Sequence, residues 1–396
     1  MMNEQQGIAA VPHGDRIELL DGLRGFALLG ILLANIDVFS GWVFLDQAQA
    51  LALAGESAVR WTELFTKAVI DGKFYTLFSL MFGVGFTLQL DRLNKRGAAG
   101  AVIFRRRMLV MLMIGLLHMS LIWEGDILTL YAALGLLLPL FMPMNDRKLL
   151  MWAVGLILLP LVLAPAFDVM NIRLGKPFFM ASGAVTQWIS GNPTAHDLQL
   201  LQSTSWRDFF AIQLSGLPFR LGYLLITWRI PKVLGIMLLG MVVGRRLIAG
   251  TLLDDRKLLL RTFWLGLVIG VPFSVTYALT EGAAQDHWSS ILGTVPLALA
   301  YAAGFVLLWP KARGLLRHLV PVGRMALTNY LMHSLVGLLL MGPFLGWAGR
   351  MQPWQFYALA LGIYGFQLVF SRVWLASHAQ GPMEKLWRYG TYRNLH

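Results

Sequence analysis

Apolar stretches of about twenty residues recur along this sequence from Leu19 almost to the C-terminus, and each is long enough to cross a bilayer as an α-helix. The chain has 396 residues, of which 57% are hydrophobic and only 14% are charged. One water-soluble core cannot bury that much apolar surface, so most of it must face lipid. We therefore expect an all-α, polytopic integral membrane helix bundle.

The positions of these stretches predict about ten spans. They cover residues 19–41, 67–90, 104–122, 126–144, 148–169, 231–249, 258–280, 288–309, 324–346 and 352–375. The predicted organisation is a cytoplasmic tail, a five-helix bundle, an extracytoplasmic segment, a second five-helix bundle and a cytoplasmic tail, at 1–18, 19–169, 170–230, 231–375 and 376–396. No basic leader precedes the first stretch, so we expect an uncleaved helix.

Lysine and arginine set the expected orientation, because they resist translocation when they lie close to the ends of a span. With the N-terminus inside, most of the 33 basic residues fall in cytoplasmic turns. We therefore expect both termini in the cytoplasm. The segment 206–228 is ambiguous, and we expect an amphipathic helix on the outer face with Arg207 and Arg220 turned toward lipid headgroups.

The composition excludes several classes of function. The chain has no cysteine, which rules out disulfides, thiolate metal sites and cysteine nucleophiles, and we expect no metal. The net charge of +12 lies in short tracts between spans, where membrane topology explains it better than binding to nucleic acid. Soluble catalytic motifs such as HExxH, GxSxG or a P-loop are absent.

The turn after the third span concentrates polar residues at the expected outer membrane boundary. His118 is followed by Glu124, Asp126 and Tyr131 around a glycine turn. An imidazole that is oriented by a carboxylate can take a proton from a hydroxyl or an amine. The pattern therefore predicts a general-base site, with an ordinary polar loop as the alternative.

The first span carries polar groups at both ends. Asp21 and Arg24 are three residues apart and can pair at the cytoplasmic surface, and an early Asp also favours the positive N-terminus of the helix. Asn35 and Asp37 lie at the outer end, where they are either solvated or functional.

The second and third spans contain charged residues of two kinds. Asp71 and Lys73 lie in the outer half of the second span, where ionisable groups are costly unless they are paired or hydrated, so a structural salt bridge is one explanation. The arginine tract of the third span, Arg105, Arg106 and Arg107, fits the rule for cytoplasmic turns and could also bind the phosphates of a nucleotide-containing donor.

Polar residues also occur in the ninth span at helical spacing. Arg324 and Thr328 are four residues apart, and so are Asn329 and His333. Each pair shares a helix face, which should look into the protein because the span is otherwise apolar. Hydrogen bonding between helices explains such residues without a catalytic role.

Several motifs together resemble one family of bacterial inner-membrane proteins. They are LDGLRGFALLGI at 20–31 with Asn35, GDIL at 125–128 with Tyr131, LLGM at 238–241 with Gly244 and Arg245, GRMALTNY at 323–330, and GPME at 381–384 with 386–388. In these features the chain resembles the YeiB-like family, whose C-terminal part is domain of unknown function 418.

The opening helix is also similar to that of the transmembrane acyltransferase superfamily, which includes heparan-α-glucosaminide acetyltransferase of lysosomes. This resemblance implies transfer of an acyl group from cytoplasmic acyl-CoA or acetyl-CoA to an acceptor across the membrane. The lysosomal relatives have a catalytic histidine shortly after the matching helix, whereas here none lies between Ile36 and Thr66. Either His118 or Asp126 takes that role, or this branch has lost the chemistry.

We therefore expect an acyltransferase that acts on a hydroxyl or amine of a glycan, lipid or small molecule. In this hypothesis His118 is the general base, Glu124 or Asp126 orients it, and Asn35 positions the acyl carbonyl. Arg24 and the arginine tract would engage the donor phosphates.

Two other functions remain open from the sequence. A small-molecule transporter would be lined by Asp71, Lys73, Asn329 and His333, although no inverted repeat is visible. A non-catalytic membrane scaffold is the third possibility. Glycine-rich helices permit close packing within one chain and between chains alike, so a homodimer is also compatible with the sequence.

Overall fold

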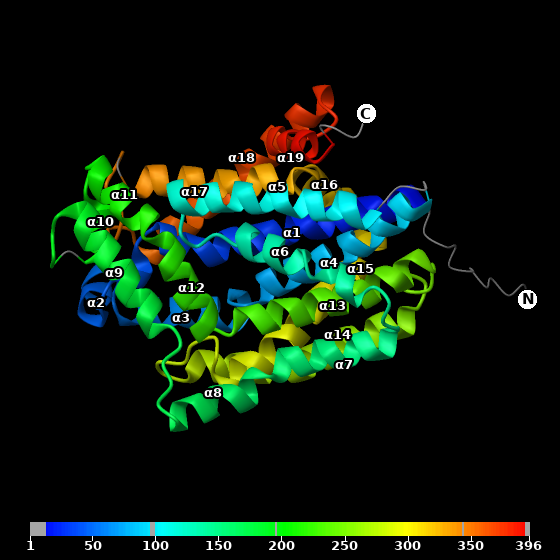
Figure 1. The fold of residues 1–396 in the computed structure, drawn as a ribbon, viewed down its shortest axis with the longest axis horizontal. Helices are drawn as coiled ribbons and strands as arrows, with labels where there is room; N and C mark the ends of the chain where they lie inside the picture. Colours follow the sequence, from blue (N-terminus) through cyan, green and yellow to red (C-terminus); the bar gives the residue numbers. More distant parts are fainter. Residues whose placement is uncertain (1–12, 96–99, 195, 343, 393–396) are drawn as a thin grey trace, which may run out of the picture.

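The computed structural model describes residues 13–95, 100–194, 196–342 and 344–392, and within these ranges it contains helices and turns but no β-strand. Figure 1 shows the long helices side by side along one axis of the molecule. The all-α class predicted from the sequence is confirmed.

The N-terminal half supplies the first long helices. Its elements are α1 (His13–Phe39), η1 (Trp42–Phe44), α2 (Gln47–Ala54), α3 (Glu56–Phe65), the π-helical turn η2 (Thr66–Ile70), α4 (Lys73–Lys95), α5 (Gly100–Leu121), α6 (Leu128–Gly135), η3 (Leu138–Phe141), α7 (Asp146–Leu158) and α8 (Pro160–Val169). The helix α1 begins within the predicted tail, six residues before the expected start of the first span.

Four short helices follow, and the remaining long helices come after them. The short ones are α9 (Lys176–Ser190), α10 (Asp197–Gln202), α11 (Trp206–Leu214) and α12 (Gly216–Ile226). The C-terminal half then contains α13 (Arg229–Ile248), α14 (Arg256–Leu279), α15 (Trp288–Leu316), η4 (Arg317–Leu319), α16 (Val320–Arg324), α17 (Ala326–Met341), α18 (Pro353–Ser377) and α19 (Pro382–Tyr392).

Six stretches of described helix are long and apolar enough to cross a membrane. They are Glu18–Phe39, Glu56–Lys95, Asp146–Val169, Arg256–Leu279, Trp288–Arg324 and Pro353–Ser377. A seventh would be α11 with α12, which are bent by 44° relative to each other. The chain is therefore a multi-pass helical membrane protein, and although each predicted span overlaps a described helix, the number ten stays a prediction.

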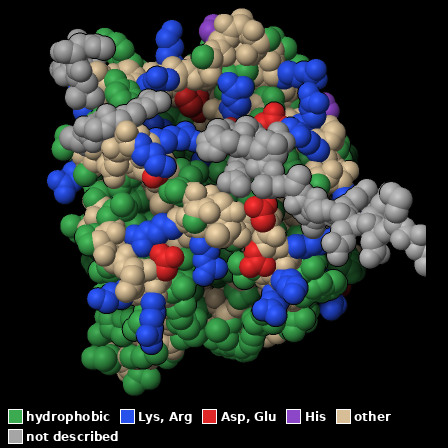
Figure 2. Space-filling view, turned by 90° about the vertical axis from the view of Figure 1, so that its right-hand side faces the viewer, with side chains coloured by type: hydrophobic (Ala, Val, Ile, Leu, Met, Phe, Trp, Pro, Cys, Tyr) green, Lys and Arg blue, Asp and Glu red, His purple; other side chains and the backbone are tan. Residues whose placement is uncertain are grey.

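The two ends of the bundle differ in character. At one end, which we call the cap end, α2, α9, α10 and α11 gather on the left of Figure 1. The opposite end is the basic end, where Figure 2 shows many Lys and Arg side chains on the surface. Exposed basic residues near the ends of helical segments include Arg92, Lys95, Arg105, Arg147, Lys148, Arg246, Arg256, Lys257, Arg317 and Arg324.

The two halves of the chain pack on each other through close helix contacts. The helix α1 contacts α16, α17 and α18 as well as α4, and α13 contacts both α4 and α7. Gly323 of α16 lies against the backbone carbonyl of Asp21 in α1, and Gly240 of α13 lies against Leu80 and Gly83 of α4. A side chain at these glycines would meet backbone atoms, so small residues permit the approach of the helices.

Candidate functional site

A histidine and a carboxylate are joined in the interior where α5 ends and α6 begins. His118 Nδ1 lies 2.9 Å from Asp126 Oδ1, and both side chains are buried. The other carboxylate oxygen, Asp126 Oδ2, accepts a hydrogen bond of 2.7 Å from the backbone N–H of Thr129. The carboxylate is thus held from two sides and fixes the orientation of the imidazole ring.

The second imidazole nitrogen is free for chemistry. His118 Nε2 is buried and has no hydrogen-bond partner among the described residues. The ring of Tyr330, from α17, lies 5.6 Å from the imidazole ring, and Trp123 lies 6.5 Å away at a right angle. The Tyr330 hydroxyl accepts a hydrogen bond of 3.2 Å from the N–H of Ile127 and so ties α17 to the α5–α6 turn. This arrangement leaves Nε2 as an unused proton acceptor in a largely aromatic wall.

The two other residues predicted for this site do not bond to His118. Glu124 lines a cavity of about 240 Å³ together with Asp197, Ser182 and Ser215, so Asp126 rather than Glu124 orients the histidine. Asn35 lies one helical turn before Phe39 on the same face of α1. The ring of Phe39 packs at 4.7 Å from that of Trp123, which places this face of α1 next to the wall of the histidine site.

Arg220 of α12 is a residue of this region that the sequence prediction placed wrongly. We expected it at lipid headgroups, but it is only 5% exposed. Its charge interacts with those of Asp126 and Glu124, and it lies in electrostatic reach of Tyr330. The wrong placement arose because an apolar segment with sparse arginines fits an interfacial helix as well as an inward-facing one. Arg207 of α11, by contrast, is exposed and donates to the carbonyl of Ile189.

A second polar cluster surrounds the break between η2 and α4. Asp71 Oδ2 accepts a hydrogen bond of 2.8 Å from the Tyr277 hydroxyl, and Asp71 Oδ1 accepts one of 2.5 Å from the Gln285 amide. The buried Lys73 donates to the carbonyl of Lys67 at 2.6 Å. The salt bridge considered for Asp71 and Lys73 is therefore not present between these described side chains.

Cations from α13 complete this cluster. Arg229 donates to Gln285 Oε1 at 3.1 Å, and Lys232 donates to the Gln285 carbonyl at 3.0 Å. Gln285 thus links both residues to Asp71. Asp37, at the end of α1, lies close enough to Asp71 for the two carboxylates to repel.

Arginines from three separate segments approach one another near the basic end. Arg24 pairs with Asp21 at 2.6 Å, as the sequence predicted. Arg107 stacks on the Trp387 ring at 3.8 Å, and it is close enough to Arg24 and Arg388 for their charges to repel. In the arginine tract only Arg107 is shown to approach Arg24, whereas Arg105 is exposed and Arg106 is half-buried.

The polar residues of the ninth predicted span are mostly used in hydrogen bonds between helices. Glu384 of α19 accepts from the N–H of Leu327 at 2.7 Å and from the Thr328 hydroxyl at 2.6 Å. Asn329 donates to Ser371 at 3.0 Å. These contacts explain the sequence motifs around 323–330 and 381–388 as structural ones, because they fasten α19 to the start of α17.

Three further residues were expected to be polar contacts in the interior. His333 Nε2 lies 2.8 Å from Gln367 Oε1 of α18, and both side chains are buried. Tyr131 shares a hydrogen bond of 2.7 Å with Ser79 and donates to the Tyr75 carbonyl at 3.0 Å. Arg324, which was expected to look into the protein, is instead exposed, because α16 ends at this residue, and it donates to the carbonyl of Ala379. Each of the three therefore joins segments that are distant in the sequence.

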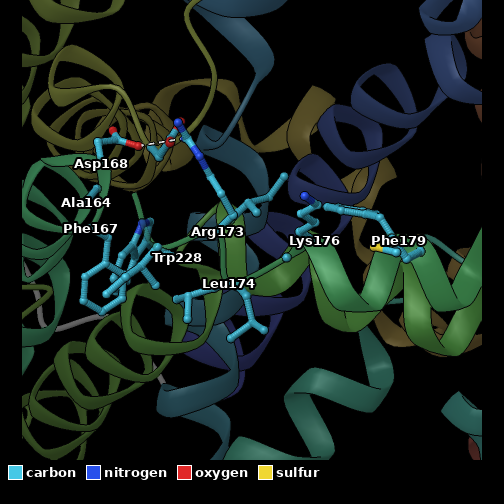
Figure 3. Close-up of a pocket in the computed structure, with 14 residues that line it drawn as sticks. Ala164, Phe167, Asp168, Arg173, Leu174, Lys176, Phe179 and Trp228 are labelled. Atoms are coloured by element: carbon cyan, nitrogen blue, oxygen red, sulfur yellow. Dashed lines mark hydrogen bonds and ion pairs between the residues drawn. The ribbon is translucent and has the colours of Figure 1, made fainter. Parts of the chain in front are cut away.

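The larger of the two cavities described here is lined by none of these groups. Figure 3 shows it between the end of α8, the start of α9 and the end of α12, with the rings of Phe167 and Trp228 on one side. Its volume is about 630 Å³, and an ion pair of 3.1 Å between Arg173 and Asp168 lies at its edge. No residue predicted for a functional site lines it.

Helices that qualify as membrane spans, with buried hydrogen-bonded charges in the interior, define a polytopic helical membrane protein. The chain belongs to the YeiB-like family. It is similar to the uncharacterized protein YxaH of Bacillus subtilis, at 32% identity over 96% of this chain and 94% of that protein. It is also 29% identical to the uncharacterized protein YeiB of Escherichia coli, over 96% of this chain and 97% of that protein.

An uncharacterized 39.9 kDa protein of Bacillus acidopullulyticus, encoded in the amylase 3' region, is 32% identical over 96% of this chain and 94% of its own length. The family model described as "Protein of unknown function (DUF418)" matches residues 243–394. The matched region includes the contact between α17 and α19. No solved structure matches the chain.

Proposed function

We propose that this protein is a membrane-embedded acyltransferase that moves an acyl group from cytoplasmic acyl-CoA to a hydroxyl or amine on the opposite side. The observation that carries the proposal is the buried pair of His118 and Asp126, in which the imidazole keeps Nε2 free. A histidine oriented in this way is suited to act as a general base.

The position of the arginines fits a donor that enters from the basic end. Arg24 and Arg107 approach each other there, and clustered guanidinium groups are suited to phosphates. Arg107 and His118 are eleven residues apart on α5, which corresponds to about three helical turns and roughly 16 Å along the axis. The two residues therefore lie on the same face, separated by a distance that the extended pantetheine arm of coenzyme A can span.

The side chains between these points are apolar. Met111 and Ile114 lie on the same buried face of α5, and flexible methionines can make room for an entering chain. Such a path would guide an acyl thioester toward His118 while keeping water away from it.

In the proposed reaction, His118 Nε2 takes the proton of the acceptor hydroxyl or amine as its oxygen or nitrogen attacks the thioester carbonyl. The Asn35 amide donates to the carbonyl oxygen as negative charge develops there. The bond between carbon and sulfur then breaks, the acyl group stays on the acceptor, and the CoA thiolate receives the proton from the imidazolium. Asp126 stays ionised and stabilises the imidazolium.

The orientation in the membrane is part of the same proposal. We place the basic end in the cytoplasm of a bacterial cell, in the inner membrane, because basic turns resist translocation. The N-terminal segment and the C-terminal tail would then lie in the cytoplasm. His118 would lie toward the outer leaflet, where the acceptor of a small-molecule, lipid or glycan type arrives.

Release of CoA tests the proposal directly. The purified protein would be incubated with acetyl-CoA or longer acyl-CoAs and candidate acceptors, and free thiol would be followed over time. We expect saturable binding of one donor and turnover that falls about 100-fold or more in His118→Gln and in Asp126→Asn, as for loss of a general base. The exposed His378→Gln serves as the matched control and should leave the rate unchanged. Full activity of both site variants would refute the assigned base.

A transporter is the second candidate, and the break at Asp71 and Gly72 favours it. Gly72 has φ +80°, and the chain leaves the helix there beside Lys73, Lys232 and Arg229. Broken helices with charged side chains are common at the binding sites of transporters. If proteoliposomes accumulated a solute without any covalent change to it, and no acyl-CoA bound, transport would replace acyl transfer.

A further inference from the structure

Several buried polar atoms between the α5–α6 turn and the helices α11 and α12 have no partner among the described residues. They are His118 Nε2, Trp123 Nε1, both amide atoms of Gln213, and Nε and Nη2 of Arg220. Gln213 is fully buried and Arg220 is 5% exposed. Buried polar atoms in native proteins are nearly always paired with protein, water or a ligand.

The packing of the two segments brings these groups to one region. Gly216, at the start of α12, lies against Glu124 and the carbonyl of Met119, so no side chain separates the segments there. Gln213 lies three residues before this contact and Arg220 four residues after it. Both therefore lie close to where α12 crosses the end of α5.

Among the described residues, no carboxylate is hydrogen-bonded to the guanidinium of Arg220. Its charge interacts with that of Asp126, but Asp126 already accepts from His118 and from the Thr129 N–H. Arg229 lies near enough to add repulsion. A buried guanidinium without a hydrogen-bonded anion costs several kcal/mol, so this region is suited to receive an anion from outside the chain.

A cavity lies beside the segments that carry these groups. The 240 Å³ cavity is lined by Glu124 and Ser215, which adjoin the Gly216 contact, and by Asp197, Thr186 and Phe219. Burial raises the pKa of Glu124 to about 7 and also raises the pKa of Asp197. The negative charge on the lining of this cavity is thereby reduced near neutral pH.

We infer that the region between His118, Gln213 and Arg220 is a binding site for an oxyanion group, a phosphate or a carboxylate, on the molecule that enters from the cap end. Arg220 binds the anion and Gln213 hydrogen-bonds beside it. The assignment of that molecule as the acyl acceptor, with its hydroxyl or amine facing His118 Nε2, rests on the proposed function. Binding of the oxyanion itself does not depend on catalysis.

Titration with small phosphates tests the site. Inorganic phosphate and glycerol 3-phosphate would be added to the detergent-purified protein at constant ionic strength, and tryptophan fluorescence and thermal unfolding would be followed. Trp123 lies at the wall of the site and should report binding. We expect saturable binding of glycerol 3-phosphate and none of glycerol, which lacks the anion. Dihexanoyl phosphatidic acid carries the same group on a lipid, so binding of this compound alone would assign the phosphate to a lipid headgroup.

Variants separate the site from general effects of charge. Arg220→Gln should weaken binding of the phosphate at least tenfold, Arg220→Lys should retain part of it, and the exposed Arg256→Gln should leave it unchanged. Gln213→Leu keeps the arginine and should weaken binding as well, which covers the case that Arg220→Gln does not fold. Equal affinity in wild type, Arg220→Gln and Gln213→Leu would overturn the inference, as would absence of saturable binding to the wild type by all three phosphates.

The outcome for catalysis is read separately. His118→Asn should retain saturable binding of inorganic phosphate, because Arg220 and Gln213 rather than the histidine hold the anion. If the wild type binds the phosphate through Arg220 but releases no CoA from any acyl-CoA, the proposed acyl transfer fails and the oxyanion site stands.

Discussion

At the scale of single residues, spacing along the sequence predicted contacts between nearby residues, but it did not predict partners that lie far apart in the sequence. The pair of His118 and Asp126 could be predicted because both belong to one turn, eight residues apart. Asp71 is hydrogen-bonded to Tyr277 and Gln285, which lie more than 200 residues away in the sequence. The pattern around Asp71 therefore suggested Lys73 as its partner instead. Arg220 was misplaced for a related reason, because its inward orientation depends on which helix covers it.

Glu124 offers a prediction about stability and pH. Burial raises the pKa of this carboxyl from 4.5 to about 7 in the folded protein, so the folded state prefers the protonated form. The contribution of Glu124 to the free energy of unfolding should therefore be most favourable below pH 4.5 and decrease as the pH rises toward 7. In thermal unfolding experiments at several pH values, Glu124→Gln should not show this part of the decrease. The variant Asp254→Asn, which changes an exposed side chain, should still show it. Parallel curves for wild type and Glu124→Gln would contradict the buried carboxyl.

At the scale of elements, the hydrophobic pattern located the helices, but their breaks and bends are visible only in the structure. The break after η2 at Asp71 and Gly72 interrupts a stretch that reads as one apolar span. The bend between α11 and α12 was likewise not visible in the composition of 206–228. Such joints depend on which neighbours accept the released backbone groups, as when Lys73 binds the Lys67 carbonyl.

The contact of α16 with α1 predicts that substitution of two glycines by alanine has very different effects on stability. An alanine at Gly323 would place its methyl group on the carbonyl oxygen of Asp21, whereas nothing lies near the corresponding position at Gly314. Gly323→Ala should destabilise the protein by about 1–3 kcal/mol, the usual range for overpacking. Gly314→Ala should be close to neutral. The two variants would be compared by thermal unfolding in the same detergent, and equal melting temperatures would argue against the close approach.

The cap that Glu384 provides for α17 predicts another pairwise difference. Glu384→Ala removes the acceptor for two backbone N–H groups and for the Thr328 hydroxyl. We expect a loss of about 1–2 kcal/mol, as for other helix caps, and faster proteolysis near α19. Lys385→Ala on the same helix changes an exposed side chain and should have little effect. Similar protease sensitivity of both variants would show that the cap does not hold α19.

At the scale of the whole molecule, composition alone was enough to predict a helical membrane bundle. The number of crossings is less accessible, because six described stretches meet the criteria of length and apolarity while other long helices carry charges. The helix α5, for example, contains the arginine tract in its second turn. In such helices the charges are tolerated where they meet partners such as Trp387, and the sequence does not reveal those partners.

Because the chain has no cysteine, single cysteines give a clean test of its topology. Thr194 is exposed at the cap end and Thr251 is exposed in the turn between α13 and α14. In intact cells, a membrane-impermeant maleimide should label Thr194→Cys and should label Thr251→Cys only after the membrane is opened. The reverse pattern would invert the proposed orientation, and labelling of both in intact cells would contradict an odd number of crossings between them.

The contact between α1 and α16 also bears on how the protein is made. About 300 residues separate these helices in the sequence, and a ribosome adds about 5–20 residues per second, so α1 enters the membrane some 15–60 s before α16 exists. During this interval the face of α1 that carries Asp21 and Gly25 has beside it only lipid, the insertion machinery or helices that are made before α16. Assembly of this protein is therefore completed late, and a chain that stops before η4 leaves its first helix without the neighbour that covers it.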